Sequence, residues 1–309
     1  MRLSRRLAII VATSVVLVTI PSAIGLYYYY KDRLLNKEAI VLQADTNTNV
    51  ANVFKPIVQA EAKLNFLSQL LQIDLAAAPE NNEVKLFDNM MQRSADGAWR
   101  SRPIKSEIDR YAGVFLPPEV KLDAKQKSLH VRGKKIIDAA AFGLNSYFTN
   151  LWLITHDKTE VISDSLIPNF TLQMPANTDY TKTAWMTLGD PTTNPLREMR
   201  WTEATYDPLI KTWMISAVKP VDVNGAWIGN IGQDMFLQNI FAILFKKTQR
   251  YHGELFFLLD EHGHYLHAGP WQQTLEANPD QFKADFSQAP LLEKLFKQKV
   301  ENSALVFEQ

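Results

Sequence analysis

The sequence of 309 residues contains no cysteine, which excludes a disulfide framework, thiol catalysis and zinc ligation by cysteine. It also lacks an excess of either charge, since 33 lysine and arginine residues balance 33 aspartate and glutamate residues. A nucleic-acid-binding protein would show a basic excess, so we expect no nucleic-acid partner. With 46% hydrophobic and 11% aromatic residues, the chain is not of a disordered type and can bury a large core.

Enzyme motifs are also missing. The chain has no Walker A motif for phosphates, no GxGxxG motif for dinucleotides and no GxSxG nucleophile motif. A hydrolase is therefore the weakest hypothesis, and we expect neither an enzyme nor a cofactor. The best metal ligands are His262, His264 and His267, but their spacing across an expected hairpin does not turn them toward one ion. A solvated turn explains them better, and no metal site is predicted.

A single hydrophobic run is long enough to cross a membrane. Residues 7–30 carry no charge, and about 20 helical residues span the hydrocarbon core of a bilayer. Residues 27–30 are all tyrosine, as in an interfacial aromatic belt, and arginines stand at positions 2, 5 and 6. By the positive-inside rule, residues 1–6 lie in the cytoplasm and the main body lies beyond a single span. The alternative is a cleaved signal peptide, with residues 7–20 as its hydrophobic region.

Residues 31–77 are expected to form one long helix that leaves the membrane as a stalk. Apolar residues between Val50 and Leu71, Leu64 and Leu67 among them, follow one another at spacings of three and four and form one stripe. Pro56 lies inside this pattern, so we expect a kink or a break there. The stripe would pair two copies of the chain in a homodimer. The alternative is that the helix packs wholly on its own domain.

Beyond the stalk, the pattern predicts an α+β region in two modules, residues 78–247 and residues 248–309. The first should contain helices at 83–92, 123–144 and 236–247, strand pairs at 147–155 with 160–163 and at 211–221 with 226–235, and an irregular segment at 168–194. Asp123 is the expected N-cap of the middle helix. The second module begins with strands at 254–260 and 264–267, a weak repeat of the first strand pair. It has far fewer residues after its turn, so we expect it to be incomplete.

A group of aromatic and charged residues in the first module suggests a small-molecule pocket. An arginine offers a fork to a carboxylate, tryptophan and tyrosine supply apolar walls with a donor at the rim, and an aspartate receives an ammonium. The alternative is that the tryptophans are core residues and that Arg200 pairs with Glu203. The predicted ligand-binding residues are Tyr180, Trp185, Arg200, Trp201, Tyr206, Asp207, Trp213 and Asp234.

This order of elements resembles the double Cache sensor domains, the extracytoplasmic part of bacterial chemoreceptors, sensor kinases and diguanylate cyclases. The resemblance covers residues 7–309 and includes the membrane anchor, the long helix and the two modules. Its local matches are Asp96-Gly97-Ala98-Trp99-Arg100, Asn194-Pro195, Trp201-Thr202, Tyr206-Asp207-Pro208, Lys211-Thr212-Trp213-Met214-Ile215-Ser216 with Lys219-Pro220-Val221, and a Gly-x-x-Gly-x-Asp string that ends at Asp234.

The resemblance implies PAS-like modules, each an antiparallel sheet flanked by helices, with the ligand held in the membrane-distal module. It implies an inner-membrane protein with a periplasmic body, and a second span and a cytoplasmic output domain that these residues do not contain. The amino-acid-binding subfamily uses an Arg-x-Trp-Tyr-x-x-Ala string, a later Tyr and a later Asp. Here Glu198 stands where that arginine belongs, whereas Tyr206 and Asp234 match the later residues. The ligand is therefore expected to bear a carboxylate or an amine.

We thus expect the ligand-sensing region of a bacterial transmembrane receptor, which binds a small molecule in the distal module and relays binding through the long helix. The alternative is a membrane-anchored periplasmic interaction module without a small-molecule ligand. The two hypotheses differ in one geometric requirement. A sensor needs four side chains to converge on one concave site, namely Arg200, Trp201, Tyr206 and Asp234.

Overall fold

The computed structural model describes residues 2–103, 111–141, 147–167, 169–207, 212–240, 258–259 and 265–267. It describes the backbone alone for residues 2–18, 38–39, 42–43, 45–46, 49–50, 53, 258–259 and 265–267. The chain divides into two compact units, Met1–Asn52 and Val53–Gln309.

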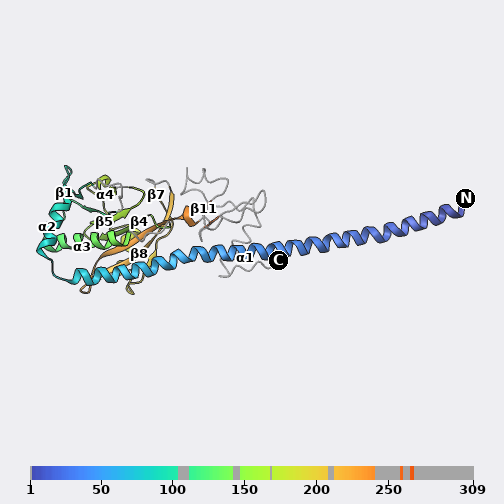
Figure 1. The fold of residues 1–309 in the computed structure, drawn as a ribbon, viewed down its shortest axis with the longest axis horizontal. Coiled ribbons are helices and arrows are strands. Elements are labelled where there is room, and N and C mark those ends of the chain that lie inside the picture. Colours follow the sequence, from blue (N-terminus) through green and yellow to red (C-terminus); the bar gives the residue numbers. More distant parts are fainter. Residues whose placement is uncertain are drawn as a thin grey trace. The chain divides into compact units, whose positions relative to one another are not determined.

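Helix α1 runs without interruption from Arg2 to Ala76 (Figure 1). The predicted break at Pro56 is therefore wrong. Pro56 is buried. A proline in a helix interior removes one backbone hydrogen bond at a cost of about 3 kcal/mol, and the helix continues through it in spite of this cost. Among the residues whose side chains are described, no helical stretch is both long and apolar enough to cross a membrane. The side chains of residues 1–18, and so the first part of the predicted span at 7–30, lie outside that description.

The second unit is built on an antiparallel sheet of nine strands in the order β1-β2-β3-β5-β4-β9-β8-β6, with β7 paired to β8 as well. The strands are β1 (Met91–Arg93), β2 (Trp99–Ser101), β3 (Gly113–Leu116), β4 (Asn150–Thr155), β5 (Glu160–Asp164), β6 (Arg200–Trp201), β7 (Thr205–Asp207), β8 (Thr212–Val223) and β9 (Ala226–Phe236). The fold class, α+β with an antiparallel sheet, agrees with the sequence prediction.

The hairpin of β8 and β9 forms where the sequence predicts it. Asn224 and Gly225 both have positive φ angles, of 52° and 79°, as a two-residue type I′ turn requires. Asparagine and glycine adopt such angles at little cost, so these two residues fix the pairing next to the turn. The register then shifts by one residue between Val221 and Asp222, and beyond this bulge Ser216 lies opposite Asp234.

The part of α1 from residue 53 onward and helix α3 (Ala124–Ala141) cover one face of the sheet (Figure 1). Leu64, Leu67 and Leu71 of α1 are at most 3% exposed and share a core cluster with Ile137 of α3 and Leu153 of β4. These three leucines of the stripe are therefore buried within their own module, as the alternative interpretation had it, and they are not free to pair two copies. The homodimer itself stays a prediction.

Polar contacts also hold α1 on its module. Ser68 Oγ donates a hydrogen bond of 2.7 Å to the carbonyl of Pro220 in β8. Lys63 Nζ donates one of 3.1 Å to the carbonyl of Ala140 in α3. Both bonds join residues far apart in the chain, so the helix is fixed to the strand and to the neighbouring helix at separate points.

A buried ion pair joins the end of α1 to α2 (Asn81–Met90) and α3. Arg132 Nε of α3 lies 2.7 Å from Glu83 Oε1 of α2, and Arg132 also donates hydrogen bonds to the carbonyls of Ala77 and Ala78 just after α1. Burial raises the pKa of the Glu83 carboxyl, but hydrogen bonds from Arg132 and Ser128 outweigh it and hold this pKa at about 2. The charged pair therefore ties the end of α1 and the first turn of α2 to the middle of α3. The start of α3 is capped as predicted, because Asp123 Oδ1 accepts the backbone N–H of Gln126 at 2.7 Å.

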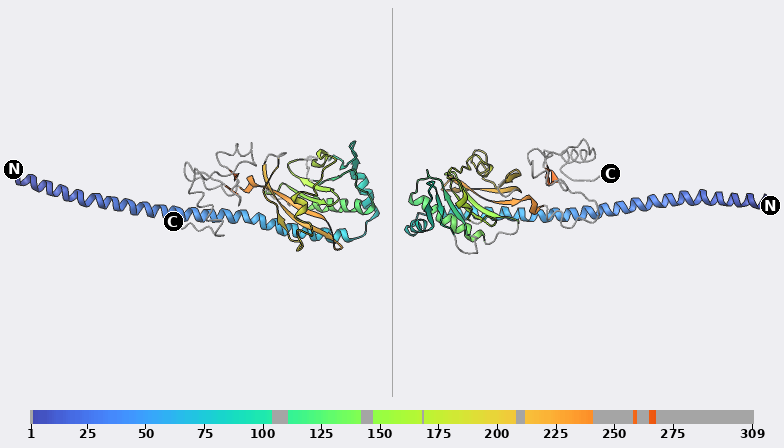
Figure 2. Two further views of the ribbon diagram at one scale, coloured as in Figure 1. Left: turned by 180° about the vertical axis from the view of Figure 1, so that it is seen from behind. Right: turned by 90° about the horizontal axis from the view of Figure 1, so that it is seen from above.

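The opposite face of the sheet packs against the segment after β5, which contains α4 (Phe170–Gln173) and α5 (Ala184–Thr187) (Figure 2). This segment was predicted to be irregular, and its two helices have four residues each. Asn230 of β9 holds α5 in place, since its Nδ2 donates to the carbonyls of Trp185 and Met186 at 2.7 and 3.0 Å. The loop after α5 is fixed by Arg197, which forms a bidentate pair with Asp222 of β8.

Little of the predicted second module is described. Strands β10 (Leu258–Leu259) and β11 (Tyr265–His267) pair antiparallel, in the region where a second strand pair is predicted. Residues 237–240 are helical, and the rest of the predicted helix at 236–247 lies outside the described residues. The same holds for most of residues 248–309 and for the side chains of His262, His264 and His267. The incompleteness of this module stays a prediction.

Candidate functional site

A row of polar residues crosses four adjacent strands on the face opposite α1. Asp164 of β5 pairs with Asn150 of β4, and Ser216 of β8 pairs with Asp234 of β9. Asn150 and Asp234 join the two halves of the row, because the Asn150 amide donates to Asp234 Oδ2 at 2.6 Å and accepts the Asp234 backbone N–H at 2.9 Å. All four residues are buried, so strand pairing concentrates polar groups inside the protein.

Asp234 is the residue of this row with the most partners. Besides Asn150, the indole Nε1 of Trp152 donates to Asp234 Oδ1 at 3.1 Å, and the Ser216 hydroxyl donates to the same carboxylate. Ser216 Oγ in turn accepts the indole N–H of Trp185 at 2.9 Å. The carboxylate and the two indoles are therefore oriented by one hydrogen-bond network that links strands β4, β8 and β9 to α5.

These residues surround a cavity of about 80 Å³ between the sheet and the α4–α5 segment. Its aromatic walls are Trp152, Phe170, Tyr180, Trp185 and Phe236. Four carboxyl groups line it, those of Glu160, Asp164, Asp207 and Asp234, and no lysine or arginine is among its described lining residues. A concave apolar site with a few convergent polar groups is the usual form of a small-molecule site.

Glu160 lies at the end of the cavity away from the polar row. Its residue is 3% exposed, and its Oε2 is buried without a hydrogen-bond partner. The pKa of the Glu160 carboxyl is raised to about 8, mainly by burial. A hydrogen bond from the Tyr180 hydroxyl lowers this pKa, whereas the Asp234 and Asp164 carboxylates contribute to the rise. At neutral pH the empty site therefore favours the protonated form of Glu160.

The two aspartates of the polar row are also affected by their surroundings. Burial raises the pKa of Asp234, against hydrogen bonds from Ser216, Asn150 and Trp152 that lower it. Burial raises the pKa of Asp164 as well, against the backbone N–H groups of residues 166 and 167, while the Asp207 charge adds to the rise. The negative charges thus repel one another inside a common low-dielectric space, which a bound cation would relieve.

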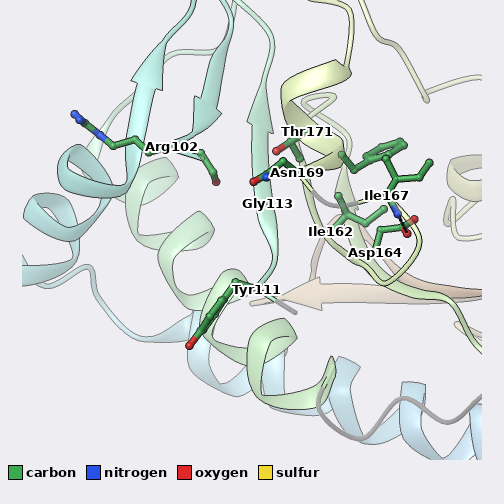
Figure 3. Close-up of a pocket in the computed structure, with 10 residues that line it drawn as sticks. Arg102, Tyr111, Gly113, Ile162, Asp164, Ile167, Asn169 and Thr171 are labelled. Atoms are coloured by element: carbon green, nitrogen blue, oxygen red, sulfur yellow. Dashed lines mark hydrogen bonds between the residues drawn. The ribbon is translucent and has the colours of Figure 1, made fainter. Parts of the chain in front are cut away.

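A second, smaller cavity of about 20 Å³ adjoins the first and shares Ile162, Asp164, Ile167 and Phe170 with it. Arg102 belongs to its lining, but in Figure 3 the guanidinium points away from Asp164, and Arg102 Nε donates to the carbonyl of Met91 at 3.3 Å. Arg102 therefore does not neutralise Asp164.

The structure brings together half of the predicted ligand-binding residues. Tyr180, Trp185, Asp207 and Asp234 line the main cavity. Their role in binding a ligand stays a proposal, since geometry alone does not show a bound molecule.

The other four predicted residues do not line this cavity. The predicted convergence of Arg200, Trp201, Tyr206 and Asp234 on one concave site is therefore not found, and of these four only Asp234 belongs to the cavity. Trp201 and Trp213 pack in the clusters on the α1 side of the sheet, and Tyr206 stacks edge-on against Trp213 with ring centres 5.6 Å apart. Successive residues of a strand point to opposite faces, so Tyr206 and Trp213 face away from Asp207 and Met214. Arg200 donates instead to the carbonyl of Thr193 at 2.7 Å. The tryptophans are partly buried core residues, as the alternative interpretation had it.

The sequence pattern did not single out Glu160, Asp164, Asn150 or Trp152. The available signal was the alternation of Glu160, Ile162 and Asp164 in a short strand, which places two carboxylates on one face. The burial of both faces of β5, where every residue is less than a tenth exposed, emerges only from the packed structure. In the part of the chain that the structure describes, no group of three or more histidine or carboxylate side chains is arranged to hold a metal ion.

No protein-family model and no curated protein matches the chain. Among solved structures, the chain is similar to the ligand-binding domain of the Campylobacter jejuni chemoreceptor Tlp3 in complex with L-norvaline, with 15% identity, a TM-score of 0.46, and coverage of 87% of this chain and 79% of that one. It is also similar to the ligand-binding domain of the Pseudomonas aeruginosa amino acid chemoreceptor PctC in complex with GABA, with 15% identity, a TM-score of 0.41 and coverage of 77% and 81%.

Both solved structures are chemoreceptor ligand-binding domains, the class of module that the sequence resembles. The low identities and TM-scores mean that these likenesses carry no argument on the ligand of this chain.

Proposed function

We propose that the chain is the extracytoplasmic ligand-sensing region of a bacterial transmembrane signalling receptor, and that it binds a small molecule in the cavity over β4, β5, β8 and β9. The single observation that carries this proposal is the cavity itself, in which aromatic walls and buried carboxylates converge. Buried polar groups without full partners are costly, and a ligand that supplies the missing partners explains why they are present. Residues 7–30 are proposed as the membrane anchor on the pattern of the sequence.

The proposed relay runs through the sheet to α1. Asp234 faces the cavity, whereas Gln233 and Met235 beside it on β9 face α1, since strand side chains alternate. Ser68 of α1 is hydrogen-bonded to Pro220 of β8, the strand that pairs with β9. A ligand that shifts β9 against β8 would therefore bias the packing of α1, provided that two arrangements exist. Hydrogen exchange of the α1 amides at 60–71 should change on ligand addition, and an unchanged pattern would contradict the relay.

The ligand proposal is tested by thermal unfolding of the full chain in detergent against a library of amino acids, amines, organic acids and purines. A ligand at 100 times its Kd adds about 2.7 kcal/mol to the free energy of unfolding, which raises Tm by several degrees. We expect at least one such shift, lost in Asp234→Asn and kept in Asp88→Asn, a control on the exposed surface of α2. A shift that Asp234→Asn retains would place the ligand elsewhere. No shift from a well-folded protein would favour the interaction module instead.

A further inference from the structure

We propose that the cavity takes a linear ligand with an ammonium group at each end and no carboxylate, such as an α,ω-diaminoalkane. This inference rests on the proposed function, because it names the ligand class of the same site. It follows from the charges of the lining, from their placement on the strands and from one unpartnered buried oxygen.

The described lining residues carry acidic groups and no basic one. Glu160, Asp164, Asp207 and Asp234 contribute carboxyl groups, and none of the lining residues that the structure describes is a lysine or an arginine. The carboxylate of an amino acid would therefore meet buried acidic groups here, and no guanidinium among these residues. Arg200, the candidate partner for such a carboxylate, is bonded to Thr193. A ligand with positive charge alone is the better match, and the aromatic walls can hold an ammonium against their π faces.

The carboxylates form two poles rather than one cluster. Glu160 and Asp164 are the first and last residues of β5 and face the same side, so their Cα atoms lie about 13 Å apart at the usual rise of a strand. Asp234 lies at the Asp164 end of the cavity, because Asn150 pairs with Asp164 across the strands and also donates a hydrogen bond to the Asp234 carboxylate. Between the poles lies the row of Ile162 and Trp152, which is apolar apart from the indole N–H. An alkyl chain with a charge at each end matches this order of acidic, apolar and acidic surface.

The Glu160 pole lacks a donor that a ligand can supply. The Oε2 atom of Glu160 is buried without a partner among the described residues, and the Tyr180 hydroxyl donates a hydrogen bond to the carboxyl group. An ammonium carries three N–H donors and no acceptor, so it satisfies this oxygen and neutralises the charge together. Metal ions are a poorer match, because the described residues contain no metal-binding arrangement of carboxylates.

The protonation state of Glu160 makes diamine binding detectable through the release of a proton. Its raised pKa, about 8, means that the empty site holds a proton at pH 7, in surroundings that also contain Asp164, Asp234 and Tyr180. An ammonium beside Glu160 favours the carboxylate, so diamine binding releases a proton to the buffer. The binding enthalpy measured at pH 7 should therefore depend on the ionisation enthalpy of the buffer.

The test is isothermal titration of the full chain in detergent with diaminoalkanes of three to six carbons, and with the monoamine and the ω-amino acid of each length. We expect one diamine to bind at least tenfold more tightly than its matched monoamine and amino acid. Glu160→Gln should reduce diamine affinity to that of the monoamine, Asp234→Asn should weaken both, and Glu119→Gln, an exposed control, should change neither.

Three outcomes would overturn the inference. These are an ω-amino acid that binds more tightly than the diamine, a Glu160→Gln variant with unchanged diamine affinity, and the absence of binding by every diamine. If a different library compound binds in a manner that depends on Asp234, the proposed sensor function stands and only the diamine class is wrong. If nothing in the library binds, the sensor function is contradicted separately.

Discussion

The indole Nε1 of Trp152 on β4 donates a hydrogen bond of 3.1 Å to Asp234 Oδ1 on the adjacent strand β9. The bond joins a tryptophan that lines the cavity to the carboxylate of the polar row that has the most hydrogen-bond partners. Both residues are at most 6% exposed, so neither group can turn to bulk water if its partner is removed. The pair is therefore both a structural element of the sheet and the basis of the ligand site.

Trp152→Phe should lower the free energy of unfolding by about 1–3 kcal/mol at pH 7, because a buried carboxylate loses one of its donors. The measurement is urea unfolding followed by circular dichroism. Trp213→Phe is the matched control, since the Trp213 Nε1 is buried without a hydrogen-bond partner and its removal frees no acceptor. Equal losses in the two variants would mean that ring volume, not the hydrogen bond to Asp234, sets the cost.

Glu160→Gln should change how stability depends on pH. The folded pKa of Glu160, about 8, lies above its ordinary value of 4.5, so the folded state holds a proton that the unfolded state releases. The wild type therefore loses stability as pH rises from about 4.5 to about 8, on the order of a few kcal/mol, and no further loss from this group follows above pH 8. Glu160→Gln should lose less stability across this window. Parallel curves for the two proteins in urea unfolding would contradict the assignment.

The ion pair of Glu83 and Arg132 predicts a different pattern. Arg132→Met should destabilise the module by about 3–5 kcal/mol in urea unfolding, because it leaves a buried carboxylate unpaired. The double variant Glu83→Met with Arg132→Met should recover a large part of this loss, since no buried charge is left. Recovery would be absent if Arg132 acted mainly through its bonds to the carbonyls of Ala77 and Ala78.

The same pair sets the acid response of the module. The pKa of Glu83 in the folded state is lowered to about 2 from its ordinary value of 4.5. Glu83 therefore contributes its full stabilisation above pH 4.5, and this stabilisation is lost as the pH falls toward 2. The double variant should therefore be less sensitive to acid than the wild type in this window. Acid unfolding curves that coincide would contradict this account of Glu83.

The two faces of α1 should respond differently to truncation. Leu64 is fully buried against the sheet, so Leu64→Ala should cost about 2–5 kcal/mol. Phe66 is 63% exposed, and Phe66→Ala should stay within about 0.5 kcal/mol. Thermal or urea unfolding distinguishes them. Similar costs at both positions would mean that the exposed face is covered in solution.

Much of the fold was accessible from the sequence, because periodicity and turn chemistry are local. Asn224-Gly225 marked the hairpin, Asp123 the start of α3, and the stripe through Leu64 and Leu67 the buried face of α1. What that stripe packs against is a tertiary property, and the sequence left open both a partner copy and the helix's own domain. At Pro56 the local rule for proline predicted a kink or a break, whereas the helix continues through this residue without a break.

The site was less accessible for the same reason. Trp201, Tyr206 and Trp213 have the composition of a ligand pocket, but strand alternation turns them toward α1. Glu160 and Asp164 lie in a short strand that carries no motif, and only the burial of both residues distinguishes them from surface carboxylates. A pattern of residue types identifies the module that binds, whereas register and burial decide which residues face the cavity.

The most direct test of the central claim is a tryptophan fluorescence titration of the full chain with the compound that gives the largest thermal shift. Trp185 lines the cavity and Trp213 lies on the opposite face of the sheet. We predict that ligand changes the fluorescence of the wild type and of Trp213→Phe by similar amounts, and that most of the change is lost in Trp185→Phe. A change that persists in Trp185→Phe and disappears in Trp213→Phe would place the ligand on the other face and contradict the proposed site.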